Sequence, residues 1–460
     1  MTLDSFLELL SDNSTSLGVF ILIAVGSFGV WRRSSAHRKA ELSLKKAKQS
    51  KLDEPISLHP QIDTTLCTGC AVCTKVCPEG DILQLINHQA VLVSPTKCVG
   101  HGECEMSCPK GAIKLVFGTK TRGMDMPRMT QHYETNVPGL YIAGELGGMG
   151  LIRNAVKQGH LAAQHALSQV SKNSNEGVLD LLIVGGGPAG LSAALTAVAE
   201  KKTYLCIEQN SFGGTVFNYP RQKIVMSAPI ELPVVGARKF RSNKVSKEEL
   251  LDLWTEIRAG MKLKIQEKTK FESLEKKADY FEVKSSRGML KAKKVILAMG
   301  VRGTPRKLGL PGEDLPKVTY NLVDPEQYRD CNLVVVGGGN AGVEAAQSLA
   351  DENLNNKVIL LVRGPQFDRC NDDNQKRIFA LAEKKRVSIY FNAQVKEIFP
   401  SSLVIEKEGK PHKVANDYLF VFAGAEMPQK MLMSFGVELV KKFGEGLNDK
   451  PSSSQAKTSN

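Results

Sequence analysis

The sequence predicts an α/β protein with two doubly wound α/β domains in series, a small cysteine-rich α+β domain before them and one N-terminal apolar helix. Three observations predict this architecture. Two apolar strands each run into a glycine-rich turn and an alanine-rich helix, at residues 178–194 and 332–346. Seven of the ten cysteines lie between positions 67 and 108, and an uncharged stretch at 14–31 precedes a basic stretch.

Length, composition and charge narrow the class of protein. The 460 residues suit about three domains. With 42% hydrophobic and 24% charged residues, the chain is neither a polytopic membrane protein nor a wholly disordered one. The net charge is +13, but residues 32–51 alone contribute +7, because eight basic residues there accompany a single acid, Glu41. The basic character is therefore local and does not indicate a nucleic-acid partner.

The uncharged stretch at 14–31 predicts a transmembrane helix. Eighteen helical residues rise about 27 Å, close to the roughly 30 Å of a bilayer core. Asp4, Glu8 and Asp12 precede it and the basic residues follow, so the positive-inside rule places the N-terminus outside and the remaining domains in the cytoplasm. We expect a single-pass protein of the cell inner membrane, with a basic juxtamembrane linker at 32–57 resting on anionic lipid. A buried core helix or a cleaved signal peptide are the alternatives.

The two cysteine runs have the spacing of iron–sulfur ligands. The first run is Cys67-x2-Cys70-x2-Cys73-x3-Cys77-Pro78. The second run is Cys98-x2-His101-x2-Cys104-x3-Cys108-Pro109, with histidine where the second cysteine belongs. In such a run three thiolates bind one cluster and the fourth serves the other cluster. Zinc is the alternative, but this repeat is rare among zinc sites, and disulfides do not suit a reducing cytoplasm.

These runs resemble those of bacterial two-cluster ferredoxins. The resemblance implies a ferredoxin domain at 58–117 in which one 4Fe-4S cluster is bound by Cys67, Cys70, Cys73 and Cys108. It implies a second cluster on Cys77, Cys98 and Cys104. Either His101 is the fourth ligand of a second 4Fe-4S cluster, which we expect, or it lies outside and the site keeps three irons. A neutral imidazole ligand would raise the cluster potential.

The first glycine loop predicts a dinucleotide-binding (Rossmann-like) domain. Its loop residues are Gly185, Gly187, Pro188, Ala189 and Gly190. A turn of this kind brings backbone amides and a helix N-terminus onto a pyrophosphate. Glu208 follows the next expected strand, 203–207, where a carboxylate can bind ribose hydroxyls.

The second glycine loop predicts a second domain of the same type. Its loop residues are Gly337, Gly339, Asn340 and Gly342. The strand expected at 357–362 ends at Arg363 without an acid, and Arg369 follows. Cations at this place suit the 2′-phosphate of NADP, whereas NAD, the alternative, prefers a carboxylate. Either arginine could equally be a solvated surface residue.

Two such domains in series resemble the flavoprotein reductases of the thioredoxin reductase type over about residues 118–447. The resemblance implies FAD on the first loop and the nicotinamide nucleotide on the second. Within this group, Gly213-Gly-Thr and Asn218-Tyr-Pro220 look most like bacillithiol disulfide reductases and related ferredoxin reductases. In the family, a segment of the type T-N-V-P-G-L-Y-x-A-G-(D/E) closes the FAD domain near the C-terminus.

Here that closing segment occurs upstream instead, at residues 135–145. We interpret this as a circular permutation, in which Gly144, Glu145 and the loop 147–150 complete the flavin pocket. The predicted boundaries follow from this arrangement: an FAD domain at 118–300, with its permuted segment at 118–170 and completed by 416–447; a NAD(P) domain at 301–415; and a disordered tail at 448–460.

The expected function is electron transfer. NADPH would reduce FAD, and single electrons would pass through the two clusters to an unknown acceptor, which could be a quinone, a cytochrome, a ferredoxin or an oxygenase. No side chain is required as an acid or base, so no catalytic residue is predicted, and a homodimer is left open. The alternatives are a low-molecular-weight disulfide reductase, which Ala189 and three isolated cysteines do not favour, and a non-catalytic membrane redox sensor or electron-transfer subunit.

Overall fold

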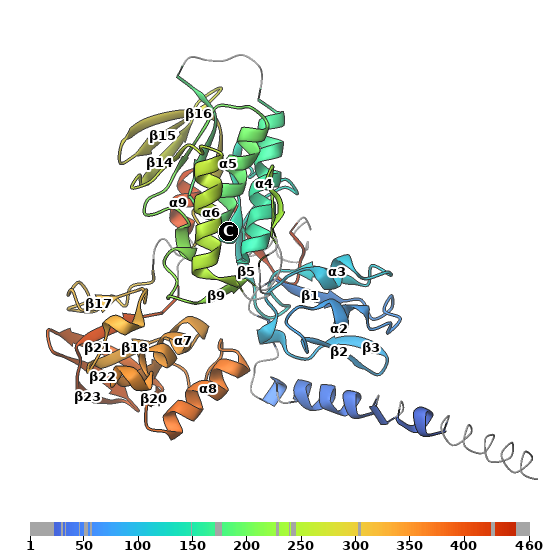
Figure 1. Ribbon diagram of the computed structural model, residues 1–460, viewed down its shortest axis with the longest axis vertical. Coiled ribbons are helices and arrows are strands. Elements are labelled where there is room, and N and C mark those ends of the chain that lie inside the picture. The colour runs from blue at the N-terminus through green and yellow to red at the C-terminus, as the bar shows by residue number, and fades with distance from the viewer. Residues whose placement is uncertain are drawn as a thin grey trace, which may run out of the picture. The chain divides into compact units, whose positions relative to one another are not determined.

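The chain divides into two units, which are described separately (Figure 1). The computed structural model describes residues 23–28, 31–32, 34–45, 47–49, 54–55, 58–148, 150–170, 177–226, 230–238, 240, 245–301, 305–424 and 428–447. The cysteine-rich unit comprises Met1–Glu54, Pro60–Lys97 and Gly102–Lys114. The nucleotide unit comprises Pro55–His59, Cys98–His101 and Leu115–Asn460.

The cysteine-rich module is a small α+β structure built from short elements. Its strands and helices are β1 (His59–Ile62), α2 (Val72–Val76), β2 (Leu83–Ile86), β3 (Gln89–Leu92), the 3-10 helix η1 (Pro95–Lys97), α3 (Glu103–Met106) and β4 (Ile113–Val116). β1 pairs with β4, and β2 with β3. The β2–β3 turn, Asn87 and His88, has positive φ at both residues, which is the hairpin turn that matches strand twist. The helix α2 lies within the first cysteine run, and α3 lies within the second.

The predicted transmembrane helix at 14–31 lies largely outside the described residues. The described residues between 23 and 49 are helical, and Ile23, Val25, Phe28 and Trp31 each expose more than half of their surface. In the part of the chain that the structure describes, no helix combines the length and apolar content that crossing a bilayer requires. The predicted disordered tail at 448–460 also lies outside the described residues.

A seven-stranded sheet forms the centre of the first nucleotide domain. Its strand order is β13-β8-β7-β16-β15-β14, and β6 pairs with β16. The strands are β6 (Leu140–Ile142), β7 (Leu179–Val184), β8 (Tyr204–Ile207), β13 (Ile265–Gln266), β14 (Phe271–Lys276), β15 (Phe281–Ser285) and β16 (Gly288–Leu297). β7 pairs in parallel with β8 and β16, whereas β14, β15 and β16 are antiparallel.

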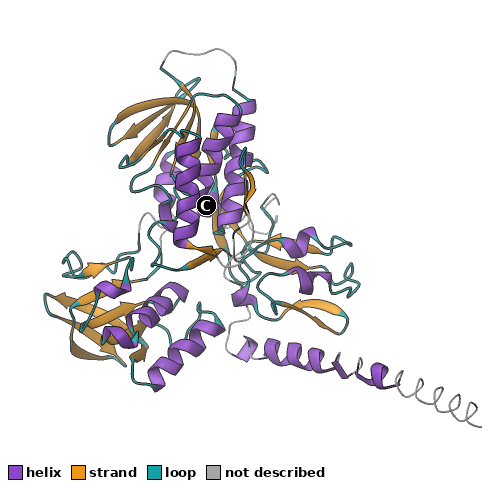
Figure 2. Ribbon diagram, viewed as in Figure 1, coloured by secondary structure: helices purple, strands orange, loops and turns teal. Residues whose placement is uncertain are grey.

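Both faces of this sheet are covered, which explains the continuous apolar run of β7. Leu181 and Ile183 join the core formed with α4 (Ile152–Ser168), α5 (Pro188–Ala199) and α6 (Lys247–Gly260), which lie side by side (Figure 2). Leu182 and Val184 point to the opposite face and pack with β14, β15 and α9 (Gln429–Ser434). The alternation follows the two-residue period of a strand.

Smaller elements complete the first domain. β5 (Met124–Pro127) pairs antiparallel with β25 (Leu439–Lys442), so segments from the two ends of the unit meet. Two further antiparallel pairs are β9 (Ile224–Met226) with β12 (Val245–Ser246), and β10 (Ile230–Leu232) with β11 (Gly236–Arg238). The 3-10 helices are η2 (Gly144–Gly147) and η3 (Gly214–Val216).

The segment that the sequence suggests has been moved upstream lies inside this domain. β6 runs parallel to β16, with Leu140 opposite Val295 and Ile142 opposite Leu297. α4 then packs on α5 so closely that a Cβ atom at Gly159 would lie 2.1 Å from the backbone oxygen of Ala189. Only glycine permits that crossing, so the helix after the segment rests directly on the first glycine loop.

The second nucleotide domain has a five-stranded parallel sheet in the order β17-β24-β18-β19-β20. Its elements are β17 (Val318–Thr319), the 3-10 helix η4 (Pro325–Gln327), β18 (Asn332–Val336), α7 (Asn340–Leu349), the 3-10 helix η5 (Glu352–Leu354), β19 (Lys357–Val362), α8 (Asp372–Glu383), β20 (Val387–Phe391) and β24 (Tyr418–Val421). β21 (Ala393–Phe399), β22 (Ser402–Lys407) and β23 (Lys410–Ala415) form a separate antiparallel sheet.

One predicted boundary needs correction. The sequence assigned residues from 416 onward to the first domain, but β24 lies between β17 and β18 and bonds to both. The second domain therefore extends through Val421. The chain returns to the first domain after that point, because α9 and β25 pack there.

Candidate functional site

The first glycine loop connects β7 to α5 as the sequence predicts. The backbone N–H of Gly185 donates to the Ile207 oxygen at 2.8 Å, which fixes the loop beside β8. A Cβ atom at Gly190 would lie 1.8 Å from the Gly185 oxygen, so this turn admits no side chain there. No side chain caps α5, whose cap residue is Gly187 and whose first residue is Pro188. The first-turn N–H groups are therefore suited to bind a pyrophosphate.

Glu208 lies at the end of β8, beside the same loop. It is buried, and its two carboxylate oxygens accept hydrogen bonds from the backbone N–H groups of Gly186 at 2.7 Å and Asn210 at 2.9 Å. The carboxylate is thus held as an acceptor next to the uncapped start of α5. This is the position from which a ribose hydroxyl pair can be bound.

Gly144 and Glu145 lie next to the first glycine loop. The backbone N–H of Gly144 donates to Gln158 Oε1 of α4 at 2.7 Å, and a Cβ atom at Gly144 would lie 3.4 Å from that of Ala189. A Cβ atom at Gly300 would lie 3.8 Å from Glu145 Oε2, so this carboxylate also approaches the chain after β16. The structure therefore brings together the two parts of the predicted flavin site, namely the upstream segment with Gly144 and Glu145 and the first glycine loop. Residue 149 of the predicted loop 147–150 lies outside the described residues.

The second glycine loop repeats the geometry of the first. A Cβ atom at Gly342 would lie 2.2 Å from the Gly337 oxygen, and no side chain caps α7, whose cap residue is Gly339. The side chain of Asn340 accepts a hydrogen bond from the Asn371 N–H at 2.8 Å and one from Asn374 at 3.2 Å. Asn340 therefore fixes the start of α8 to the loop.

Arg363 and Arg369 follow β19, and two further arginines, Arg122 and Arg306, lie close enough to Arg369 to act on its charge. Desolvation and the positive charges of Arg122 and Arg306 lower the pKa of Arg369, and Arg363 adds to the same effect, while Asp368 opposes it. All four arginines are exposed residues. Mutually repelling cations of this kind favour an anionic ligand.

Sequence reasoning identified two of these arginines and missed the other two. Arg122 precedes β5, far from the second loop along the chain, and Arg306 lies in the connection between the two domains. No spacing rule links either residue to the second glycine loop. The pairing of β5 with β25 brings the upstream segment, and with it Arg122, into this unit. This pairing is a tertiary contact, so a sequence pattern could not reveal it.

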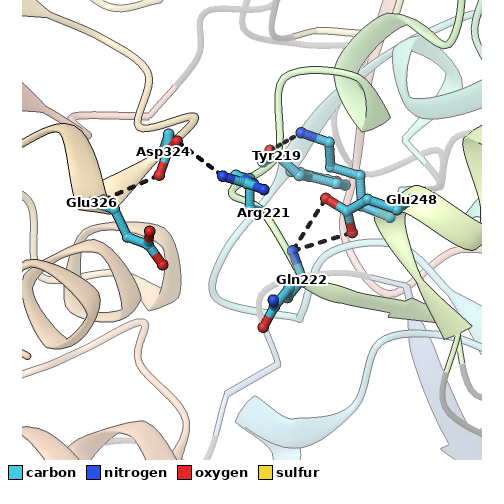
Figure 3. A network of polar contacts seen from close by, with 7 residues as sticks. Tyr219, Arg221, Gln222, Glu248, Asp324 and Glu326 are labelled. Carbon is cyan, nitrogen blue, oxygen red and sulfur yellow. Dashed lines mark hydrogen bonds and ion pairs between the residues drawn. The ribbon is translucent and has the colours of Figure 1, made fainter.

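A polar network joins the two nucleotide domains (Figure 3). Arg221 bonds to Asp324 at 3.4 Å through its side chain and to the Val323 oxygen at 3.0 Å through its backbone N–H. Lys223 Nζ lies 2.9 Å from Glu344 Oε2, on the helix that follows the second glycine loop. Lys223 of the first domain thus contacts the helix that would bind the nicotinamide nucleotide.

A pocket in the cysteine-rich unit draws its ligands from both cysteine runs. Its thiols are those of Cys67, Cys70, Cys73 and Cys108. Burial raises the pKa of the Cys73 thiol, and the charges of the other three cysteines raise it further, which places all four near one another. The N–H of Ala90 donates to Cys67 Sγ at 3.4 Å, and that of Ala112 donates to Cys108 Sγ at 3.3 Å. N–H donors to sulfur are a feature of iron–sulfur sites, so this pocket fits a cluster.

The remaining ligands predicted for the second cluster are divided between the units. Cys77 and Cys104 belong to the cysteine-rich unit, and Cys98 and His101 belong to the nucleotide unit. That they share a cluster stays a prediction. Among the described residues, no three His, Cys, Asp or Glu side chains meet as tightly as a single metal ion would need. A four-iron cluster spreads its ligands around a cube, so its ligands need not lie as close together as those of a single metal ion.

These features define an NAD(P)H-dependent flavoprotein oxidoreductase that carries a 4Fe-4S ferredoxin domain. A family model for pyridine nucleotide-disulphide oxidoreductases matches residues 182–457, and a 4Fe-4S dicluster domain model matches residues 59–109. The chain belongs to the pyridine nucleotide-disulphide oxidoreductase family. The predicted resemblance to a thioredoxin-reductase-like flavoprotein fused to a ferredoxin module is confirmed.

Individual relatives match somewhat more than half of the chain. A ferredoxin–NADP reductase of Ignicoccus hospitalis is 28% identical over 278 residues, which are 59% of this chain and 83% of that protein. Bacilliredoxin reductase Bdr of Bacillus subtilis is 28% identical over 267 residues, 57% of this chain and 82% of that protein. The solved bacillithiol disulfide reductase Bdr from Bacillus cereus is 26% identical and superposes with a TM-score of 0.51, covering 56% of this chain and 82% of that one.

Proposed function

We propose that this protein is a membrane-anchored NADPH-dependent reductase that passes electrons from FAD through two iron–sulfur clusters to an external acceptor. The observation that carries the proposal is a four-cysteine pocket in the same chain as two nucleotide loops. Nicotinamide delivers two electrons as a hydride, and an iron–sulfur cluster carries one at a time. Flavin is the cofactor that converts between the two modes.

The roles of the protein's own groups are to bind and to position. The uncapped start of α5 would hold the FAD pyrophosphate, with Glu208 on its ribose and Gly144 and Glu145 completing the flavin pocket. The start of α7 would hold the nicotinamide nucleotide in the same way. Bound FAD would supply the hydride and single-electron chemistry. No side chain has to transfer a proton, so no catalytic residue is proposed.

We further propose that NADPH is preferred over NADH. Arg363 and Arg369 follow β19, where an NAD-binding domain would place a carboxylate, and Arg122 and Arg306 add positive charge near them. The name of the Ignicoccus hospitalis relative, a ferredoxin–NADP reductase, agrees with this choice.

A second cluster on Cys77, Cys98 and Cys104 is part of the proposal, with His101 as its fourth ligand. The support is the repeated ligand spacing, together with the first pocket, in which Cys108 of the second run joins three cysteines of the first. That exchange between runs is what a two-cluster module requires. A three-iron cluster without His101 is the alternative outcome.

The circular permutation is also proposed. One support is the residue pattern at 135–145. The other is structural: β6 pairs with β16 and α4 packs on α5, and in a family member the C-terminal segment would occupy these two positions. The permutation joins the FAD domain directly to the ferredoxin module.

Disulfide reduction, although it stands in the name of the solved Bacillus cereus relative, is the weaker proposal. Burial raises the pKa of Cys370 to about 12 and raises that of Cys206, and desolvation raises that of Cys331. Thiols with raised pKa values are poor nucleophiles at neutral pH. Ala189 occupies the loop position where bacillithiol disulfide reductases place a cysteine.

Membrane anchoring is proposed from the sequence at 14–31 and the basic residues that follow. The exposed apolar side chains of Ile23, Val25, Phe28 and Trp31 support it. We propose an inner-membrane location with the N-terminus outside. Deleting residues 1–31 should move the protein from the membrane fraction to the soluble fraction. Recovery of the intact chain in the soluble fraction would refute the anchoring.

Anaerobic titration with NADPH tests the central proposal. The flavin absorbance should bleach first, and electron paramagnetic resonance should then show reduced clusters, whose spectra distinguish three-iron from four-iron centres. Protein purified without oxygen that holds neither flavin nor inorganic sulfide would refute the proposal. So would a flavin that NADPH reduces while both intact clusters stay oxidised.

A further inference from the structure

The loop that carries two of the predicted second-cluster ligands, Cys98–His101, belongs to the nucleotide unit, although the rest of the ferredoxin sequence around it does not. Gly100 is buried, and a Cβ atom on it would lie 2.8 Å from the Leu58 oxygen. Leu58 is itself part of the core that contains Phe117 and Leu140 of the first nucleotide domain. Cys98 Sγ approaches the same Leu58 oxygen at 3.9 Å.

Two side chains from the first turn of α4 hold this loop. Arg153 Nη2 donates to the backbone oxygen of His101 at 3.4 Å, and Asn154 Nδ2 donates to that of Gly100 at 3.3 Å. Both bonds are to backbone oxygens, so they fix the path of the loop rather than the state of a ligand side chain.

The same turn of α4 adjoins the predicted flavin pocket. α4 starts at Ile152, directly after η2 and the Gly144–Gly150 segment, and Gln158 of α4 accepts the N–H of Gly144. The helix therefore contacts the flavin site at one side chain and the Cys98–His101 loop at two others. One rigid element positions both.

The other cluster pocket lies in a different unit and opens to solvent. Cys70, one of its predicted ligands, is exposed. An exposed ligand suits the cluster from which an acceptor protein takes electrons.

We propose that electrons leaving the flavin arrive first at the cluster bound by the Cys98–His101 loop, and second at the cluster in the Cys67, Cys70, Cys73 and Cys108 pocket, which delivers them to the acceptor. Arg153 and Asn154 are positioning residues that hold the receiving loop at the flavin domain. This order rests on the proposed function.

The electrons and atoms balance in this order. The nicotinamide C–H bond breaks, its hydride passes to the flavin, and NADP+ is released. One proton then passes to solvent. The two electrons would move one at a time, first through the cluster at the Cys98–His101 loop and then through the cluster that includes Cys70. They reduce two molecules of a one-electron acceptor protein.

The first experiment compares the double variant Arg153→Ala/Asn154→Ala with Lys157→Ala, which alters an exposed residue one turn further along α4. Before any reductant is added, hydrogen exchange of the peptide over 98–102 should be faster in the double variant only. After NADPH is mixed in, flavin bleaching should keep its rate within about twofold, and cluster reduction should slow about tenfold, as expected when two hydrogen bonds are lost. Lys157→Ala should match the wild type in both measurements.

The second experiment removes one cluster at a time. In Cys98→Ala, NADPH should leave the remaining cluster oxidised although dithionite reduces it; in Cys70→Ala, NADPH should still reduce the remaining cluster. The opposite pattern, or unchanged exchange and unchanged cluster reduction in the double variant, overturns the proposed order. Failure of NADPH to bleach the wild-type flavin would instead contradict the proposed function, so the two failures are distinguishable.

Discussion

Gly159 offers the most direct test of how the upstream segment supports the flavin site. In Gly159→Ala the new Cβ atom would lie 2.1 Å from the Ala189 oxygen and 2.8 Å from its carbon. Both are backbone atoms at the start of α5, so α4 and α5 must separate by about 1 Å to reach normal contact. Overpacking of this kind costs about 1–3 kcal/mol, and the better helix propensity of alanine offsets about 0.5–1 kcal/mol.

We therefore expect Gly159→Ala to lower the free energy of unfolding by about 1–2 kcal/mol and to weaken FAD binding about tenfold. Urea unfolding measures the first quantity, and flavin release during thermal denaturation measures the second. Gly260→Ala is the matched control, because it lies at the end of α6 with no atom within 4 Å of the new Cβ. A Gly159→Ala protein as stable and as rich in FAD as Gly260→Ala would refute the close crossing of α4 and α5.

Three further predictions concern the cofactor sites and pH dependence. Arg369→Ala should raise KM for NADPH about tenfold to a hundredfold, as expected for a lost bond to a phosphate, with KM for NADH changed by no more than about twofold in steady-state assays. Cys70→Ala should leave flavin reduction by NADPH intact and abolish electron delivery to an artificial one-electron acceptor; loss of flavin reduction in a folded, FAD-loaded protein would contradict this. Burial and the neighbouring His132 lower the pKa of His165 from 6.5, so the folded state resists protonation and stability should fall as the pH drops through that value. In urea titrations, the free energy of unfolding of His165→Gln should decrease less between about pH 7.5 and about pH 5.5 than that of the wild type. Equal decreases would refute the attribution of this pH dependence to His165.

Local sequence patterns predicted most of the nucleotide domains. The β7 and β18 strands, the glycine loops and the helices that follow them each lie within one or two residues of the expected positions. These units depend on local rules, namely apolar strands covered on both faces and tight turns that admit only glycine. The boundary near residue 416 was missed, because the place of β24 between β17 and β18 depends on pairing with distant strands.

The cluster and phosphate sites show the same limit. The resemblance to two-cluster ferredoxins grouped Cys108 with Cys67, Cys70 and Cys73, and these four cysteines line one pocket. It could not predict that residues 98–101 would pack on the nucleotide unit, because the contacts come from Arg153 and Asn154, whose residue types carry no ligand signal. Arg122 and Arg306 were missed for a similar reason, since electrostatic proximity arises only after folding.

The pairing of β6 with β16 has a consequence for biosynthesis. All three residues of β6, Leu140–Ile142, are fully buried, yet their partners at Val295–Leu297 leave the ribosome about 155 residues later. At about 5–20 residues per second this delay lasts roughly 8–30 seconds. During that interval an apolar strand has no native partner, so we expect nascent chains to depend on chaperones more strongly than those of a reductase in which the strand is made last.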